Sequence, residues 1–148
     1  MSLFSKDLFS ETDRQKIVEA IIEAEQNTSG EIRLFIEDKC EGDVLDRAAF
    51  IFKQLHIHET KERNGVLFYL ATVSHKFAIL GDAGINALVP KDFWDHIKDE
   101  MQLHFKAGDF VGGLIKGISM SDDALKKYFP YDKNDKNELS NEIIFGKD

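Results

Sequence analysis

Two apolar runs joined by a short polar loop constrain this sequence more than any other feature. Residues 66–71 and 77–80 are apolar along their whole length, and the loop between them is short enough for a hairpin. Strands that are apolar on both faces need cover on both faces, so helices must lie above and below the sheet. The expected fold class is therefore α/β, a three-layer αβα sandwich with a mixed sheet of about four strands.

Other segments supply a further strand and the helices. Residues 31–37 place apolar side chains at every second position, which predicts a strand with one well-buried face. Apolar residues recur at helical spacing in further stretches, and polar residues or glycines there can cap or end each helix. The sequence predicts helices after Ser10, after Asp43, from a first turn at Pro90 to a stop at Gly108, and after Asp109 with a restart at Ser121.

Length and composition indicate one domain. A chain of 148 residues can bury one sizeable core, so we expect a single domain over residues 1–148 with its core at about 10–130. Residues 131–148 form a polar tail, apart from Ile143, Ile144 and Phe145. We expect this tail to be poorly ordered unless those three side chains dock on the domain.

Charge and composition exclude several partner classes. A net charge of -8 argues against binding to nucleic acid or to an anionic membrane surface. No apolar run approaches transmembrane length, the first residues lack the layout of a signal peptide, and the single Cys40 forms no internal disulfide. We therefore expect a cytoplasmic monomer without a membrane partner, and the sequence identifies no protein partner.

An aspartate between glycines follows the second apolar run. Gly81 and Gly84 permit close backbone approach, so Asp82 is well placed to meet a cation or a ligand. Gly-Asp-x-Gly is also ordinary turn chemistry, in which the aspartate bonds its own backbone. Both interpretations of Asp82 stay open at this point.

Hairpin pairing gathers further oxygen donors around Asp82. If Ala71 or Thr72 faces Lys76, Asp82 lies beside Gly65 and the loop before it. If the strand at 31–37 also runs parallel to the strand at 77–80, its end at Asp38 lies at the same edge of the sheet as Asp82. The starts of the helices that follow strands gather at that edge too. The expected metal ligands are Asp38, Asp46, Glu62, Asn64, Asp82 and Asp109. Such donors suit a divalent cation, Ca²⁺ first and Mg²⁺ second, although each residue taken singly also reads as a cap or a solvated turn.

Other common site chemistries lack their patterns. His56 and His58 have no second pair to complete a zinc site, and Cys40 has no obvious base partner. The glycine-rich nucleotide motifs are absent, so nucleotide or cofactor binding lacks support. Residues 132–137 imitate an EF-hand loop without its glycine or its terminal glutamate, and no nucleophile elbow marks a serine hydrolase.

Four short stretches resemble those of a known family. They are Gly30-Glu31-Ile32, Asn64-Gly65-Val66-Leu67, Gly81-Asp82-Ala83-Gly84, and Phe105-Lys106-Ala107-Gly108-Asp109-Phe110 with Gly112-Gly113. In order and spacing they resemble the TPM domain, a family named for a thylakoid lumen phosphatase, a photosystem repair protein and an acetylcholine-receptor modulator. The resemblance runs from about residue 10 to residue 130, and the chain looks like a stand-alone, bacterial-type member.

The resemblance carries expectations of its own. It implies a sheet of about four strands between helices and a loop-built acidic site for divalent cations, usually calcium. Acid phosphatase activity is ascribed to plant members, and many members carry a signal peptide and a membrane anchor, which this sequence lacks. Much of the family has Gly-aromatic-Gly where this chain has residues 81–84, so the phosphatase activity does not carry over with the resemblance.

Three functions stay open: a metal-binding domain whose ion ties surface loops together, a metal-dependent acid phosphatase acting on phosphate monoesters, and an interaction module. A phosphate dianion needs basic donors beside the metal, and the acidic motifs contain only Arg47, Arg63 and Lys106, of which Arg63 is the best candidate. We expect feeble or no hydrolysis of phosphate monoesters. Asp82→Asn is expected to shrink the stabilisation by calcium and to leave the metal-free melting temperature unchanged or slightly higher.

Overall fold

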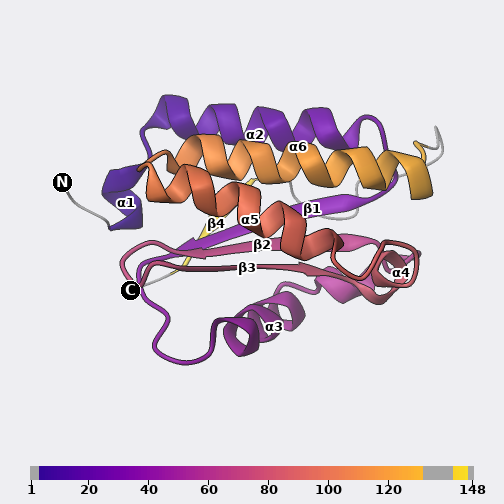
Figure 1. The fold of residues 1–148 in the computed structure, drawn as a ribbon, viewed down its shortest axis with the longest axis horizontal. Coiled ribbons are helices and arrows are strands. Elements are labelled where there is room, and N and C mark those ends of the chain that lie inside the picture. Colours follow the sequence, from indigo (N-terminus) through magenta and orange to yellow (C-terminus); the bar gives the residue numbers. More distant parts are fainter. Residues whose placement is uncertain (1–3, 132–141, 147–148) are drawn as a thin grey trace.

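A mixed four-stranded sheet forms the centre of the fold (Figure 1). The computed structural model of the chain describes residues 4–131 and 142–146. The strand order is β3-β2-β1-β4, with β1 parallel to both of its neighbours and β2 antiparallel to β3. The strands are β1 (Glu31–Glu37), β2 (Gly65–Ala71), β3 (Lys76–Gly81) and β4 (Ile143–Phe145).

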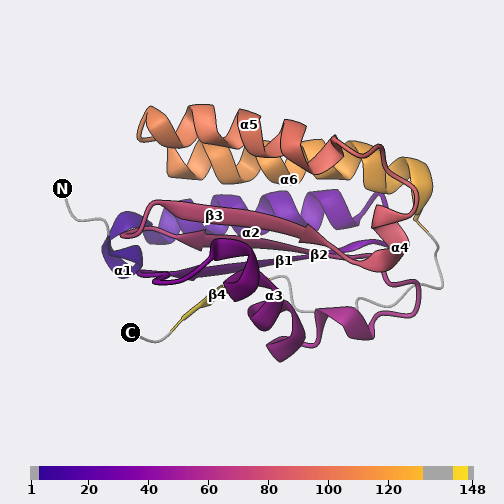
Figure 2. The same cartoon turned by 60° about the horizontal axis from the view of Figure 1, so that its bottom comes forward.

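Helices cover both faces of this sheet, as its apolar strands require. One layer contains α2 (Glu11–Glu25), α6 (Phe110–Tyr128) and α5 (Phe93–Lys106), and α6 packs against both of the others. The opposite face carries α3 (Val44–Gln54), as Figures 1 and 2 show. Shorter elements are α1 (Ser5–Leu8), the 3-10 helix η1 (Ile57–Glu59) and α4 (Ala83–Asn86). The predicted α/β sandwich with helices on both faces is confirmed.

Caps and glycines set the element boundaries where the sequence indicates them. The Ser10 hydroxyl accepts a hydrogen bond from the Asp13 amide in a capping box at the start of α2. The side chains of Asp43 and Asp109 cap α3 and α6 by accepting hydrogen bonds from the amides of Asp46 and Gly112. Gly108, at a φ of 81°, ends α5 in the left-handed conformation that glycine adopts most readily.

The side chains of β1 divide between two cores. Ile32, Leu34 and Ile36 pack in the larger core together with residues of α2, α5 and α6. Phe35 points the other way, into a smaller core with Tyr69 and the apolar face of α3. This alternation follows from the period of two along a strand and explains why both helical layers are needed.

Close packing between α5 and α6 depends on a glycine. A Cβ atom added at Gly113 would lie 2.5 Å from Cε1 of Phe105 and 3.1 Å from Cβ of His104. The glycine therefore lets the two helices approach closely, which offsets its low helix propensity.

The direction of β1 differs from the prediction that built the metal site. The hairpin register is as expected, with Ala71 opposite Lys76 and the Asp82 amide donating to the Gly65 carbonyl at 2.9 Å. However, β1 runs parallel to β2 and therefore antiparallel to β3. The condition on which the single metal site depended, a β1 strand parallel to β3, is not met, because β1, α3 and β2 form a crossover unit that makes β1 and β2 parallel.

Several boundaries differ in smaller ways. Pro90 precedes α5 instead of lying in its first turn, and α6 continues through Ser121, whose hydroxyl donates to the Gly117 carbonyl inside the helix. Part of the predicted tail joins the sheet as β4, so the ordered domain extends beyond residue 130. Residues 132–141 and 147–148, for which poor order was expected, lie outside the described residues.

Candidate functional site

The six predicted metal ligands divide between the two ends of the sheet. Glu62, Asn64 and Asp82 lie at the end where β2 begins and β3 stops. Asp38 lies at the opposite end, where β1 stops, because β1 is antiparallel to β3. The starts of α3 and α6, which carry Asp46 and Asp109, also lie at this second end of the sheet (Figure 1). The structure therefore does not bring the six residues into one site.

At the first end, an arginine engages Asp82. Nε and a terminal nitrogen of Arg63 each donate to one carboxylate oxygen of Asp82 at 2.8 Å. The same carboxylate accepts a hydrogen bond from the Ala83 amide at 2.7 Å and so caps α4. The side chain of Asp82 is 4% exposed. These contacts are those of a structural turn and ion pair, and they leave Asp82 poorly placed to bind a metal ion.

The neighbours of Asp82 are also bonded to the protein. Asn64 is buried, and its side-chain amide donates to the hydroxyl of Ser29 at 3.4 Å and to the carboxylate of Glu62 at 3.5 Å. Ser29 in turn donates to the same Glu62 oxygen at 3.0 Å. This small network ties the start of β2 to the loop before β1, so Glu62 and Asn64 hold these segments together.

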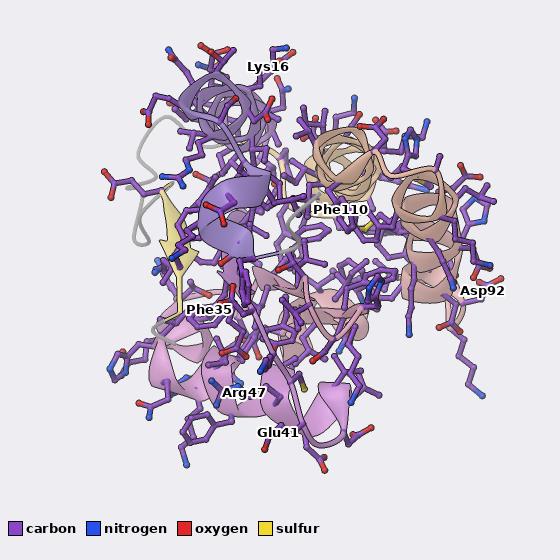
Figure 3. All side chains as sticks on the ribbon, turned by 90° about the vertical axis from the view of Figure 1, so that its left-hand side faces the viewer. Lys16, Phe35, Glu41, Arg47, Asp92 and Phe110 are labelled. Carbon is purple, nitrogen blue, oxygen red and sulfur yellow. The ribbon has the colours of Figure 1, made fainter. Side chains whose placement is uncertain are left out.

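The second end contains a pocket of about 760 Å³. Figure 3 views the molecule from this end, with Glu41 and Arg47 on the α3 side of the sheet and Phe110 in the opposite helical layer. Residues 37–43, the first turn of α3 and Phe4 line the pocket. Its five acidic side chains outnumber its two basic ones; they are Glu37, Asp38, Glu41, Asp43 and Asp46, against Lys39 and Arg47.

One of these acids is neutralised at the edge of the sheet. Both oxygens of Glu37 accept hydrogen bonds from Arg47 at 2.9 Å, and the Tyr69 hydroxyl also bonds to this carboxylate. Hydrogen bonding to Glu37 raises the pKa of Arg47, and burial, followed by the bond to Glu37, raises the pKa of Tyr69. Glu37 therefore serves as a structural anion that ties α3 to the sheet.

Glu41, Asp43 and Asp46 are the pocket acids that could offer oxygen atoms to a ligand. Asp43 uses one oxygen to cap α3, through the Asp46 amide at 3.1 Å. Within the described part of the chain, neither Glu41 nor Asp46 forms an ion pair. Asp38 is more constrained, because one of its oxygens accepts hydrogen bonds from both the amide and the hydroxyl of Ser5 at 2.8 Å.

A lysine ammonium group already lies against the backbone of this loop. Nζ of Lys76 donates to the carbonyl oxygens of Cys40 at 3.1 Å and Gly42 at 2.8 Å. These carbonyls converge on a cation beside the acidic side chains. The loop thus presents neutral and anionic oxygens together, which is the donor chemistry of a hard-cation site.

The acidic side chains of the pocket lie too far apart to coordinate one metal ion in the arrangement that the structure shows. Among the described residues, no three His, Cys, Asp or Glu side chains are close enough together to hold a metal ion. Asp109 does not line the pocket; it caps α6 and lies 3.3 Å from Nδ1 of His104. Of the six predicted ligands, only Asp38 and Asp46 share the pocket.

Sequence reasoning missed two of the acidic residues that line this pocket. Glu41 and Asp43 lie in the loop between β1 and α3, and neither is among the six ligands expected from the sequence. The available signal was their position between β1 and α3, because loops after parallel strands gather at the ligand-binding edge of an open sheet. Lys76 carries no such signal, because its approach to the loop depends on the hairpin register.

Comparison with known proteins identifies the family. The family model for the TPM domain matches residues 4–124, which is most of the chain. The chain belongs to the TPM domain family. No curated protein matches this chain.

Solved structures agree with this TPM assignment. The NMR structure of the BA42 protein from the psychrophilic bacterium Bizionia argentinensis is 46% identical, with a TM-score of 0.89 over 96% of this chain and 98% of that one. The N-terminal domain of a protein from P. gingivalis has a TM-score of 0.68 at 17% identity, over 86% of this chain and 85% of that one. The N-terminal domain of the cg2496 protein from Corynebacterium glutamicum has a TM-score of 0.66 at 13% identity, over 82% of this chain and 76% of that one. At these lower identities the likeness concerns the fold alone.

A helix that crosses a membrane must be long and predominantly apolar. None of the helices in residues 4–131 and 142–146 has both the length and the apolar character needed to cross a bilayer.

Proposed function

We propose that this TPM domain binds a divalent cation, calcium before magnesium, in the pocket at the end of β1. The observation that carries the proposal is the Lys76 ammonium group, which donates to the carbonyl oxygens of Cys40 and Gly42, two residues that line the acidic pocket. A loop whose carbonyl oxygens accept hydrogen bonds from the Lys76 ammonium group presents the oxygen ligands that a hard cation prefers. The side chains that would hold the ion are those of Glu41, Asp43 and Asp46. The carbonyls of Cys40 and Gly42 would join them once the ion displaces the Lys76 ammonium group.

The ligand atoms of this pocket are oxygens, which calcium prefers, but residues 40–46 must move closer together to coordinate one ion. Calcium accepts six to eight oxygens in flexible geometry and readily includes water, whereas magnesium demands a near-ideal octahedron. Of the three acids named above, Glu41 and Asp43 lie in the loop before α3 and Asp46 lies in the first turn of that helix. Bound calcium would then link residues 40–46 and neutralise their mutual repulsion.

The geometry favours cation binding over phosphoryl transfer. A phosphatase needs basic donors that are free to meet the phosphate dianion. Arg63, the best candidate from the sequence, is engaged by Asp82, and Arg47 is engaged by Glu37. Both guanidinium groups use paired contacts that a phosphate would have to break.

Calcium titration followed by backbone amide shifts tests the proposal. We expect saturable shifts in residues 38–47 and none in residues 62–64 or at Asp82. At a hundredfold excess over the dissociation constant, binding to the folded state stabilises it by about 2.7 kcal/mol. That corresponds to a rise in melting temperature of roughly 5 to 10 °C for a domain of this size.

Two variants and a control locate the effect. Glu41→Gln and Asp46→Asn should each weaken calcium binding at nearly constant shape. Asp99→Asn on the exposed side of α5 should leave it unchanged, because Asp99 lies outside the pocket. Identical melting curves in chelator and in excess calcium would refute cation binding altogether. Shifts confined to residues 62–64 and 82 would refute its location.

A further inference from the structure

The side chain of Lys76 reaches the pocket loop from a distant part of the chain. Lys76 begins β3, and its ammonium group donates to the carbonyl oxygens of Cys40 and Gly42, which lie 36 and 34 residues earlier. The turn before β3 holds the same loop, because the Ser74 hydroxyl accepts a hydrogen bond from the Cys40 amide at 2.9 Å. The hairpin therefore keeps the Lys76 side chain beside the pocket loop.

The positive charge of Lys76 is met by backbone dipoles. Among the described residues, this half-buried lysine forms no ion pair. Its ammonium group instead uses two carbonyl oxygens, at 3.1 and 2.8 Å, within the negative potential of the pocket acids. Lys76 is thus bonded as a monovalent cation from solution would be, through oxygen ligands of the loop backbone.

A calcium ion and the ammonium group need the same oxygens. Calcium lies about 2.3–2.6 Å from its oxygen ligands, so an ion on the Gly42 carbonyl would lie close to an Nζ atom 2.8 Å from that oxygen. The two positive charges would repel each other, so calcium must displace the ammonium group from these carbonyls. Because the lysine is tethered, it competes with any ion at an effective concentration on the order of millimolar.

The charge of the incoming ion decides whether displacement is favourable. A monovalent ion brings the same charge as the ammonium group, so it gains no additional attraction to the pocket acids. A divalent ion gains about twice that attraction at the same distance. The tethered lysine therefore costs a monovalent ion proportionally more than a divalent one.

We propose that Lys76 is the specificity-determining residue of the cation pocket. Its ammonium group is a resident monovalent cation that keeps Na⁺ and K⁺ off the loop carbonyls and is displaced by a divalent ion. This role rests on the proposed function, because it requires calcium to bind at residues 40–46. It lowers the affinity for calcium and in return makes the site selective against monovalent ions.

Lys76→Met tests the competition, because methionine removes the charge and keeps most of the side-chain length. If the ammonium group holds the carbonyls about nine-tenths of the time, its loss raises the apparent calcium affinity about tenfold. We expect such a gain by isothermal titration calorimetry, with amide shifts at residues 38–47 as in the wild type. Lys76→Gln should behave in the same way, whereas Lys76→Arg keeps the charge and should bind calcium much as the wild type does.

Lys39→Met is the matched control for charge. Lys39 is exposed and lines the pocket, but no hydrogen bond joins it to the loop carbonyls within the described part of the chain. Its removal takes the same charge from the same pocket, and salt screens an exposed charge, so the gain in calcium affinity should stay below about threefold. Equal gains in Lys39→Met and Lys76→Met would reduce the effect to general electrostatics and overturn the proposal.

Calcium titrations in two salts test the selectivity. KCl and choline chloride at the same ionic strength, about 0.15 M, screen charge alike, but choline is too bulky to bind between the two carbonyls. The wild type should bind calcium equally in both salts. Lys76→Met should bind calcium more weakly in KCl, because K⁺ then competes for the vacated carbonyls. A variant with the same affinity in both salts would overturn the selectivity.

The remaining outcomes separate the role of Lys76 from the proposed function. Calcium shifts at residues 38–47 in the wild type, with no gain in Lys76→Met or Lys76→Gln, would overturn the role of Lys76 and leave the calcium site standing. Weaker binding by both variants, with an intact amide spectrum, would make the lysine an organiser of the loop and also overturn the proposal. Absence of any calcium response in the wild type and in the variants would refute both.

Discussion

Asp82→Asn separates the structural interpretation of Asp82 from the metal-binding one. If Asp82 were a metal ligand among repelling carboxylates, the variant would lose calcium stabilisation and keep or gain stability in chelator. In the structure, Asp82 instead forms a paired contact with Arg63 and caps α4. The variant should therefore lose stability in chelator and keep the full response to calcium.

The magnitude follows from what the substitution removes. Asparagine can still cap α4 through its carbonyl oxygen, so that contribution changes little. The contact with Arg63 loses its charge, and one of its two hydrogen bonds would face an amide donor. Hydrogen bonds to charged groups contribute about 1.5–3 kcal/mol, but Arg63 is 52% exposed and can recover water contacts. We expect a net loss of about 1–2 kcal/mol, or roughly 2 to 8 °C in melting temperature.

The assay is a melting curve in chelator and in excess calcium for wild type, Asp82→Asn and the control Asp99→Asn. Asp99 is exposed on α5 and, within the described part of the chain, forms no ion pair, so its variant should melt within about a degree of the wild type. Arg63→Gln should cost about as much as Asp82→Asn, and the double variant little more than either, because both remove one interaction. A higher melting temperature for Asp82→Asn in chelator, together with a lost calcium response, would refute this reasoning.

Two further predictions concern α6. Gly113→Ala should lower the free energy of unfolding, measured by chemical denaturation, by about 1–2 kcal/mol, because the added Cβ meets Phe105. This loss outweighs the better helix propensity of alanine. The control Ser119→Ala, at an exposed position of α6, should change the free energy of unfolding by only a few tenths of a kcal/mol. For Asp109, hydrogen bonding from the Gly112 amide, and then from His104, lowers the pKa of the carboxyl below its ordinary value of 3.8. A depressed folded-state pKa gives stability that is present above the unfolded value and is lost as pH falls through the folded value. Asp109→Asn should therefore cost about 0.3–0.5 kcal/mol at pH 6 and progressively less as the pH falls below 3.8, and a loss that stays constant with pH would contradict the role of charge at this exposed cap.

Local structure could be predicted from the sequence because its signals are short-range. The alternation at residues 31–37 gave β1 with its correct ends, and Ser10, Asp43 and Asp109 marked the three helix starts that they cap. Helix α4 was missed because its four residues are too few for a periodic pattern. The docking of residues 143–145 was left conditional, because it depends on a surface made by β1 and α2.

The candidate site depended on one long-range choice, the direction of β1. Hydrophobic pattern fixes which residues face the core and is the same for either direction of a strand. Choosing β3 as the parallel partner placed Asp38 beside Asp82, whereas the structure places them at opposite ends of the sheet. The length of the connection could have decided the matter, since a helix between two strands crosses over the sheet and makes them parallel.

Charge balance then distinguishes the two ends of the sheet. Arg63 lies two residues before β2 and forms an ion pair with Asp82, so the carboxylate at the end of β3 already has a cationic partner. At the other end Arg47 neutralises Glu37 alone, and Glu41, Asp43 and Asp46 share a small loop with only Lys39 and the Lys76 ammonium group nearby. Excess negative charge in a loop is destabilising without a counterion, so a cation is favoured where the acids outnumber their basic partners. This imbalance, more than the presence of acidic residues, is the reason to expect calcium beside α3 and not beside α4.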